Sequence, residues 1–166
     1  MKFHLFLVLL FTGISAFAQP AANDINSFTN RVEAKNVLQN GLKEGKWVEY
    51  LRMVNNGIVM ADSDSASFYR LTIYKDNIPC GMVRLYTIKG LLLSETPYSN
   101  GKRDGISKAY GSKNGNLLYE DIYNNGQHAM TRFYNENGKL QCVTTYSANK
   151  EFVTKTYDDK GNEVKD

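Results

Sequence analysis

Tyrosines recur along this chain at a nearly constant interval, and this period limits the possible folds more than any other feature. They stand in steps of 11 to 13 residues at Tyr74, Tyr86, Tyr98, Tyr110, Tyr123, Tyr134, Tyr146 and Tyr157. Asn-Gly pairs or single glycines lie between them, and Asn-Gly suits a two-residue hairpin turn because both residues adopt positive φ at low cost. Each step therefore predicts one strand and one turn, and two steps predict a β-hairpin repeat of about 24 residues.

Repeated hairpins of this period predict an all-β protein, an elongated antiparallel β-meander. Its regular strands are expected near residues 82–87, 91–98, 105–110, 116–123, 129–134, 139–146 and 151–157. An earlier strand contains Trp47 and runs on to Val54. An insertion near 55–67 follows, with a turn at 55–57, a return through 58–61 and a polar loop at 62–67 before the strand that ends at Tyr74. The apolar spacing of an amphipathic helix is not expected anywhere after the first eighteen residues.

The N-terminus has the pattern of a secretory signal peptide. Lys2 precedes an apolar run from Phe3 to Ile14, and Ala16-Phe17-Ala18 matches the small-x-small cleavage pattern. The apolar run is shorter than the roughly 20 residues that span a bilayer. We therefore expect a signal peptide at 1–18, a flexible mature N-terminus at 19–39, the repeat domain at 40–162 and a polar tail at 163–166. The mature chain would be periplasmic or extracellular, without a transmembrane segment.

The charge balance argues against nucleic-acid binding, and the positions of the cysteines argue against a disulfide. Lys and Arg number 20 against 17 Asp and Glu, and a net charge of +3 is too small to indicate a nucleic-acid binder. The two cysteines, Cys80 and Cys142, are about five strands apart in the predicted sheet. At ~4.8 Å per strand this is roughly 24 Å, far beyond the ~7 Å between Cα atoms that a disulfide allows. Both are expected to be free thiols.

The repeat resembles a known family. Tyr98, Asn100, Gly101, Gly105, Tyr110, Gly115 and Leu117 follow the pattern Y-x-N-G-x-x-x-G-x-x-x-x-Y-x-x-x-G-x-L, with the last gap one residue longer. This pattern resembles the MORN-repeat variant family, which includes YwqK-type antitoxin-like proteins, and Gly45 to Tyr50 is similar to the family's opening copy. The resemblance covers roughly residues 40–162. It implies stacked hairpins, and it implies no catalytic residues, because the shared positions are turn glycines and packing aromatics.

Catalytic and metal-binding patterns are weak. His128 is the only histidine after residue 18, and it is expected to be a surface residue beside a turn. The motifs of serine hydrolases, zinc proteases and phosphate-binding loops do not occur. Asp62-x-Asp64 is similar to the start of a calcium loop but lacks the later glycine and glutamate. We expect no enzyme activity, no metal and no cofactor; a hydrolase that uses Asp62 and Asp64 stays the least favoured alternative.

The basic residues follow the repeat. Counting two residues back from alternate tyrosines places four cations on one side of the sheet, because side chains alternate along a strand: Arg84, Lys108, Arg132 and Lys155. Arg70 is assigned the equivalent place before Tyr74, and the alternation predicts that Tyr86, Tyr98, Tyr110, Tyr119, Tyr123, Tyr134, Tyr146 and Tyr157 share this side. Long basic stems over tyrosine rings keep an exposed face soluble, or they bind an extended anion. Glu95, Glu120 and Asp121 partly neutralise the row.

The opposite side is predicted to be apolar. It would contain Val83, Leu85, Leu91, Leu93, Leu118, Ile122, Phe133 and Val143. Either the N-terminal segment and the 55–67 insertion cover this side, or a partner docks on it. Trp47 projects to the same side and is the best candidate for an anchor in a cap or an interface.

These residues predict an exported, non-enzymatic repeat module that binds a protein or a component of the cell envelope. The candidate binding residues are Arg84, Lys108, Arg132, Lys155, Tyr86, Tyr110, Tyr134 and Trp47. One alternative is attachment to anionic lipid or polysaccharide through the four cations. The other, which rests on the family resemblance, is an antitoxin-like role.

Overall fold

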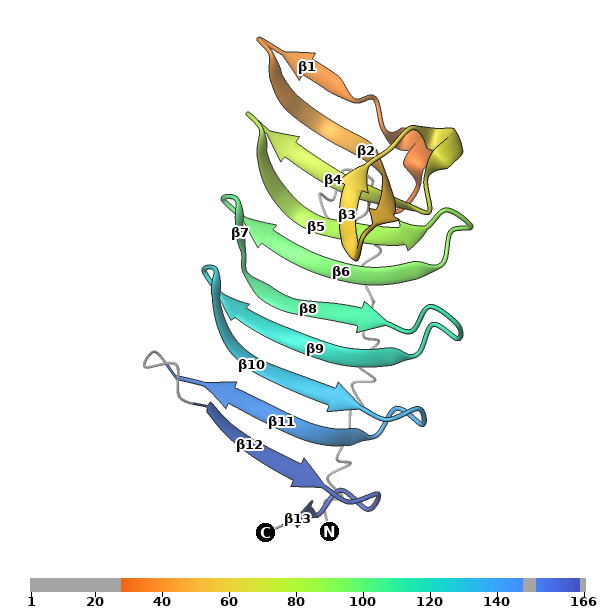
Figure 1. Ribbon diagram of the computed structural model, residues 1–166. Coiled ribbons are helices and arrows are strands. Elements are labelled where there is room, and N and C mark those ends of the chain that lie inside the picture. Colours follow the sequence, from red (N-terminus) through yellow and green to blue (C-terminus); the bar gives the residue numbers. More distant parts are fainter. Residues whose placement is uncertain (1–27, 148–151, 165–166) are drawn as a thin grey trace, which may run out of the picture.

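A computed structural model describes residues 28–147 and 152–164 as one open antiparallel sheet of 13 strands. The strands follow one another in chain order from β1 to β13 in a single layer (Figure 1). This confirms the predicted all-β meander. The signal peptide predicted at 1–18 lies outside the described residues. Within the described ranges, no helix is long and apolar enough to cross a bilayer.

The elements agree with the predicted strands to within a few residues at each end. The strands are β1 (Val37–Gln39), β2 (Leu42–Val54), β3 (Gly57–Met60), β4 (Phe68–Lys75), β5 (Ile78–Thr87), β6 (Leu92–Ser99), β7 (Lys102–Arg103), β8 (Gly105–Tyr110), β9 (Leu117–Asn124), β10 (Gln127–Tyr134), β11 (Leu140–Tyr146), β12 (Phe152–Tyr157) and β13 (Glu163–Val164). Of two short 3-10 helices, η1 (Arg31–Glu33) precedes β1 and η2 (Ser63–Ser65) lies between β3 and β4. β3 pairs only with β2, and β7 only with β6, beside the main order of the sheet.

Along one side of the sheet, two-residue turns join the strands. Asn100 and Gly101 have φ of 48° and 78°, the left-handed conformation of a type I′ turn. The pairs Asn40-Gly41, Asp76-Asn77 and Asn125-Gly126 have positive φ at both residues as well, and so does Asn55-Asn56, which joins β2 to β3 at the other end of β2. The Asn-Gly signals at Asn40, Asn100 and Asn125 therefore identify two-residue turns correctly, whereas Asn114-Gly115 and Asn137-Gly138 lie in longer turns, where only the glycine has positive φ.

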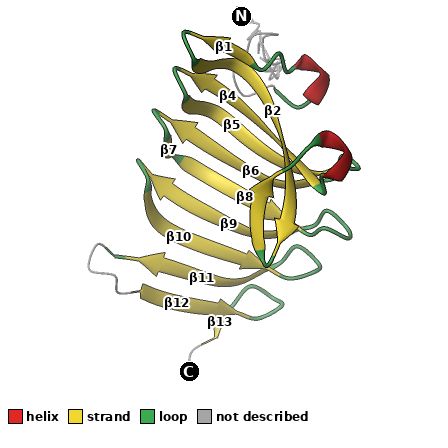
Figure 2. Cartoon of the chain, turned by 45° about the horizontal axis from the view of Figure 1, so that its top comes forward, coloured by secondary structure: helices red, strands yellow, loops and turns green. Residues whose placement is uncertain are grey.

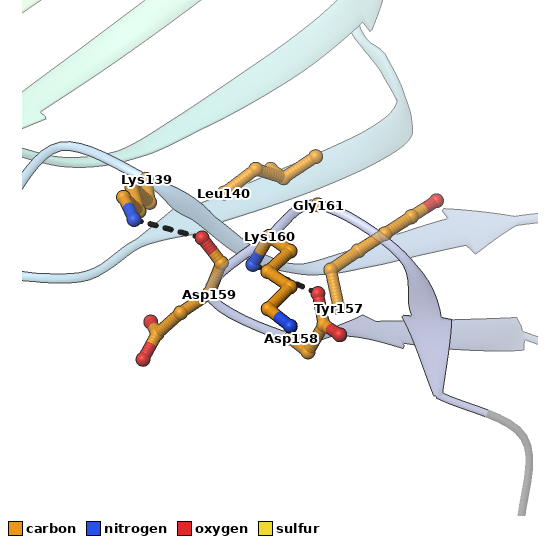
Figure 3. Close-up of a pocket in the computed structure, with 7 residues that line it drawn as sticks. All are labelled: Lys139, Leu140, Tyr157, Asp158, Asp159, Lys160 and Gly161. Carbon is orange, nitrogen blue, oxygen red and sulfur yellow. Dashed lines mark hydrogen bonds between the residues drawn. The ribbon is translucent and has the colours of Figure 1, made fainter.

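Along the other side, longer turns begin with a residue that caps its own loop. The amide N–H groups of Asn137 and Lys139 donate to Asn135 Oδ1 at 3.0 and 2.9 Å, and the backbones of Asn135 and Lys139 also bond. Asp158 has the same role after β12, where Lys160 N and Asn162 N each donate to its Oδ1 at 2.9 Å (Figure 3). These hydrogen bonds hold the pKa of Asp158 below its usual value.

Both faces of the sheet are covered at its N-terminal end, by different segments. Phe28 is fully buried against Tyr69, Leu71 and Tyr86 on one face. On the other face, β2 runs on past the sheet and β3 returns in front of β4 and β5 (Figures 1 and 2). The sequence predicts, as one of two alternatives, that both covering segments lie on the same apolar face, and it predicts that residues 19–39 are flexible. In the structure, the described part of that stretch contains η1, the edge strand β1 and the most buried phenylalanine.

Candidate binding surfaces on the two faces of the sheet

One face has a ladder of alternating charges that crosses five strands. Cross-strand pairing joins Arg84 to Glu95, Glu95 to Lys108, Lys108 to Glu120 and Glu120 to Arg132. The row continues through Val143 to Lys155. We call this side, defined by the five charged residues from Arg84 to Arg132, the charged face. All four predicted cations therefore share one face, and two carboxylates stand between them.

Each of these two carboxylates binds a cation and a tyrosine. Arg84 Nε donates to Glu95 Oε1 at 2.8 Å, and the Tyr110 hydroxyl donates to Glu95 Oε2 at 3.1 Å. One repeat later, Glu120 Oε2 accepts from Arg132 Nη1 at 3.4 Å and from the Tyr134 hydroxyl at 2.8 Å. Both carboxylates bind a tyrosine further along the chain, but the arginine lies on the preceding strand at Glu95 and on the following strand at Glu120.

The tyrosines respond to this environment. Partial burial and the negative charge of Glu95 together raise the pKa of Tyr110 to about 12. Burial and the hydrogen bond to Glu120 raise the pKa of Tyr134 in the same direction. Both rings stay neutral at physiological pH and act as hydrogen-bond donors, which is a structural role.

The charged face has little charge to offer an anionic polymer. Arg84, Lys108 and Arg132 contribute three positive charges, and the two glutamates remove two of them. Lys155 Nζ lies 2.9 Å from Glu163 Oε2. Arg84 is also 8% exposed and donates through Nη1 to the backbone oxygen of Phe28 at 2.9 Å. The four cations thus bind the fold's own acceptors or stand between its carboxylates.

The closing tyrosines do not share one face, and this prediction was wrong. Register and contacts place Tyr86, Tyr110, Tyr134 and Tyr157 on the charged face, and Tyr74, Tyr98, Tyr123 and Tyr146 on the opposite one. Tyr119 and Arg70 also lie opposite the charged face. Two residues predicted on the apolar side, Ile122 and Val143, lie on the charged face instead. Val83, Leu85, Phe133 and Trp47 lie opposite the charged face, as predicted.

Turn length explains the error. Residues that face each other across the two-residue turn Asn100-Gly101 are separated by an odd number of positions, as Glu95 and Lys108 are, and the same holds for Val83 and Thr96 across the preceding turn. An even step of 12, such as that from Tyr86 to Tyr98, therefore changes the face. Two such steps restore it, and for this reason Arg84 and Lys108, which are 24 residues apart, were placed correctly.

The opposite side, which we call the aromatic face, is defined in β8 to β12 by Tyr119, Tyr123, Phe133, Tyr146 and Phe152. Its middle row consists of short polar residues in register: Ser107, Asp121, Thr131, Thr144 and Thr154. Tyr119 and Tyr123 lie on either side of Asp121, and four residues of strand separate their Cα atoms by roughly 13 Å. Two aromatic rows thus flank a polar one across the strands.

The two aromatic rows differ in exposure. On one side, Tyr119 and Phe133 pack with ring centroids 5.9 Å apart and are 37% and 42% exposed. On the other side, His128 lies between Tyr123 and Tyr146, with centroid distances of 4.9 and 4.4 Å. Tyr123 is buried and its hydroxyl accepts from Arg103 Nη1 at 2.8 Å. The side chains of Tyr119 and Phe133 are therefore partly exposed, whereas the rings of Tyr123, His128 and Tyr146 pack against one another.

His128 is the functional candidate that the sequence did not reveal. Its Nε2 lies 3.0 Å from both Asp121 Oδ1 and Thr131 Oγ1, and Thr131 Oγ1 donates to Asp121 Oδ1 at 2.6 Å. A catalytic triad needs the two ring nitrogens to contact different partners, so that one receives the proton of the nucleophile. Here one nitrogen contacts both partners, so the cluster orders the aromatic row and does not form a triad.

Trp47 lies outside the rows of the aromatic face. It packs edge to face on Tyr74, with ring centroids 6.1 Å apart, and Lys43 Nζ is 4.8 Å from both ring centroids. Its Nε1 donates to the backbone oxygen of Glu44 at 3.1 Å. These contacts make Trp47 part of the packing at the N-terminal end.

The remaining candidates have weaker geometry. Asp62 and Asp64 are exposed at the loop before β4, and Ser63 Oγ lies 3.2 Å from Asp64 Oδ1. No group of His, Cys, Asp and Glu in residues 28–147 and 152–164 has the arrangement of a metal site. Cys80 and Cys142 are free, as predicted.

A hollow of about 390 Å³ lies at the turn between β12 and β13 (Figure 3). Lys139 Nζ donates to the backbone oxygen of Asp159 at 2.7 Å, and Asp158 caps its own turn. The polar groups around the hollow thus bind one another, and the shape of the turn produces the hollow.

A scan against protein-family models finds no match for this chain, and a search of curated proteins finds no similar sequence. The MORN-variant resemblance therefore stays a prediction that rests on the repeat pattern.

Proposed function

We propose that this protein is an exported, non-enzymatic module that binds a neutral, extended polysaccharide of the cell envelope on its aromatic face. The exposed pair of Tyr119 and Phe133 is the observation that supports this most. Apolar rings on a single-layer sheet meet water unless a partner covers them. Flat rings stack on the apolar faces of sugars, and the neighbouring hydroxyl, carboxylate and imidazole groups suit the hydroxyls of a sugar.

Charge favours a neutral ligand. In β8 to β12 the aromatic face has one carboxylate, that of Asp121, and Arg103 extends over Tyr123 from the preceding strand. The two charges oppose each other, which leaves no excess charge to attract an anionic polymer. On the charged face, the paired cations weaken the alternative of anionic lipid or polysaccharide. The aromatic rows run across the strands, so a long ligand would contact several repeats and gain a small increment from each.

Hydrolysis is not part of the proposal. Glycosidases of the usual type place two carboxylates about 5 to 10 Å apart on the same side of the substrate channel. Among the described residues in β8 to β12, only Asp121 has a carboxylate on the aromatic face, because Glu120 points to the other face.

Isothermal titration calorimetry of the mature chain with neutral linear hexasaccharides, chitohexaose and cellohexaose, tests the proposal. We expect Phe133→Ala to weaken binding at least tenfold, because an exposed stacking ring is removed. The matched control is Ile106→Ala, which truncates a side chain that is 43% exposed on the charged face. The double variant Lys108→Gln and Arg132→Gln on the charged face should bind like the unmodified chain.

Two outcomes would contradict the proposal. One is binding that Phe133→Ala leaves unchanged. The other is binding that the charged-face variant abolishes and that falls steeply with salt, which would favour the anionic alternative.

A further inference from the structure

A separate cavity of about 460 Å³ lies at the N-terminal end of the aromatic face, between β3 and the sheet. Ile58 and Met60 line it from β3, and Leu51, Val83 and Leu85 line it from β2 and β5. Its volume falls within the range of sites for small organic ligands. These five lining residues are apolar and come from both sides, so this part of the cavity suits an apolar body.

The two side chains from β3 are poorly covered. Ile58 and Met60 are 54% and 60% exposed although both line the cavity. β3 is hydrogen-bonded only to β2, through the pairs of Ile58 with Met53 and of Met60 with Leu51. A ligand in the cavity would cover apolar area of both side chains, which favours binding.

One lining residue of the cavity is a cation. Arg70 lines it, and its Nε and Nη2 bind Glu49 Oε2 at 2.9 and 2.8 Å, which leaves Nη1 outside that pair. Lys43 Nζ binds the other oxygen of Glu49 at 2.6 Å. Two cations thus share one carboxylate, and one positive charge is in excess.

Glu49 does not lose its charge in this setting. Burial alone would raise its pKa, but the hydrogen bond from Lys43 and the charge of Arg70 outweigh burial, so the pKa lies below its usual value. Three hydroxyl side chains of β6 complete the lining: Ser94, Thr96 and Tyr98.

We propose that this cavity binds a small aliphatic carboxylate of about the size of octanoate. Its chain lies between β3 and the sheet, and its carboxylate lies toward Arg70. A neutral or cationic head group would lose the attraction of the excess positive charge, and a polar body would gain nothing from the aliphatic walls. The site is independent of the polysaccharide surface, which lies on β8 to β12.

Titration calorimetry with octanoate, octanol and octylamine tests the head group. Octanoate should bind one molecule per chain, octanol at least tenfold more weakly, and octylamine without measurable heat. Equal binding of octanol and octanoate, or no binding of octanoate up to millimolar concentration, would overturn the proposal.

A pair of variants of β3 tests the position of the site. The double variant Ile58→Ser and Met60→Ser should weaken octanoate binding at least tenfold. Both side chains are exposed, so the variant should keep the unfolding temperature. Val59→Ser is the matched control, because Val59 is 40% exposed on the same strand but does not line the cavity. If Val59→Ser weakens binding as much as the double variant does, the ligand lies elsewhere and the assignment is wrong.

Discussion

At the scale of single residues, Glu95 and Glu120 occupy equivalent positions in successive repeats. Each carboxylate accepts from an arginine beside it and from the tyrosine that closes the next strand. Repetition of this kind arises when a hairpin is copied together with the contacts it needs. In the last repeat Val143 takes the equivalent position, next to Lys155. The arrangement therefore fades toward the C-terminal end.

The first prediction concerns the titration of Tyr110. Burial and the charge of Glu95 raise its pKa to about 12, so Glu95→Gln should lower it toward 10, the ordinary value. The fold favours the neutral phenol, so its contribution to stability is complete below about pH 10. It is lost as the pH rises from there through about 12. Phenolate absorbance during alkaline titration, compared with that of Tyr110→Phe, measures the shift.

Glu136→Gln provides the control for this titration, because Glu136 is exposed and its removal should leave the phenolate curve unchanged. A Tyr110 pKa that does not move in Glu95→Gln would mean that burial alone explains the shift.

The residue scale also shows what the sequence could predict. The cations of the charged face were placed correctly because Arg84, Lys108 and Arg132 lie 24 residues apart, one full hairpin. The tyrosines were misplaced because the face of each depends on the number of residues in every turn between them. His128 has no signal in the sequence, because its partners Asp121 and Tyr146 come from other strands. In addition, the sequence predicts Tyr146 on the side of the cations.

At the scale of elements, the two sides of the meander use different turns. Asn-Gly pairs are visible in sequence because both residues favour positive φ, and they located one set of turns. The capped turns after β5, β10 and β12 begin with Thr87, Asn135 and Asp158, which share only a side-chain oxygen. Phe28 was harder still to predict. A single phenylalanine in a polar stretch has no periodic pattern, and only the folded sheet supplies its neighbours.

The second prediction compares two glycines with similar backbone. Gly101 and Gly138 have φ of 78° and 74°, so an alanine at either should cost about 1–2 kcal/mol for the left-handed conformation. A Cβ at Gly101 would in addition lie 3.1 Å from Ile78 Cγ2, whereas one at Gly138 meets nothing within 4 Å. Gly101→Ala should therefore reduce the free energy of unfolding, measured by urea denaturation, more than Gly138→Ala does. Equal losses would show that Ile78 moves aside without cost.

At the scale of the whole molecule, each strand of the main sheet contacts chiefly its neighbours in the order β1 to β13. The N-terminal end has covers on both faces, and its core contains Phe28, Tyr69, Leu71 and Tyr86. By contrast, β12 is exposed at every residue except Tyr157. Since an array of this kind is stabilised repeat by repeat, stability should decline from the N-terminal end to the C-terminal end.

The third prediction follows from this gradient. Phe28→Ala should reduce stability by about 3–5 kcal/mol, because a fully buried phenylalanine is lost. Its effect should be local. In hydrogen exchange followed by mass spectrometry, the amides of β4 and β5 should exchange faster than in the unmodified chain, and those of β10 and β11 should not change. Phe133→Ala is the control, since Phe133 is 42% exposed and its loss should cost far less. If Phe28→Ala raised exchange equally from β4 to β11, the sheet would unfold as one cooperative unit. The strands at the C-terminal end, with the proposed polysaccharide surface, would then depend on packing that lies several strands away.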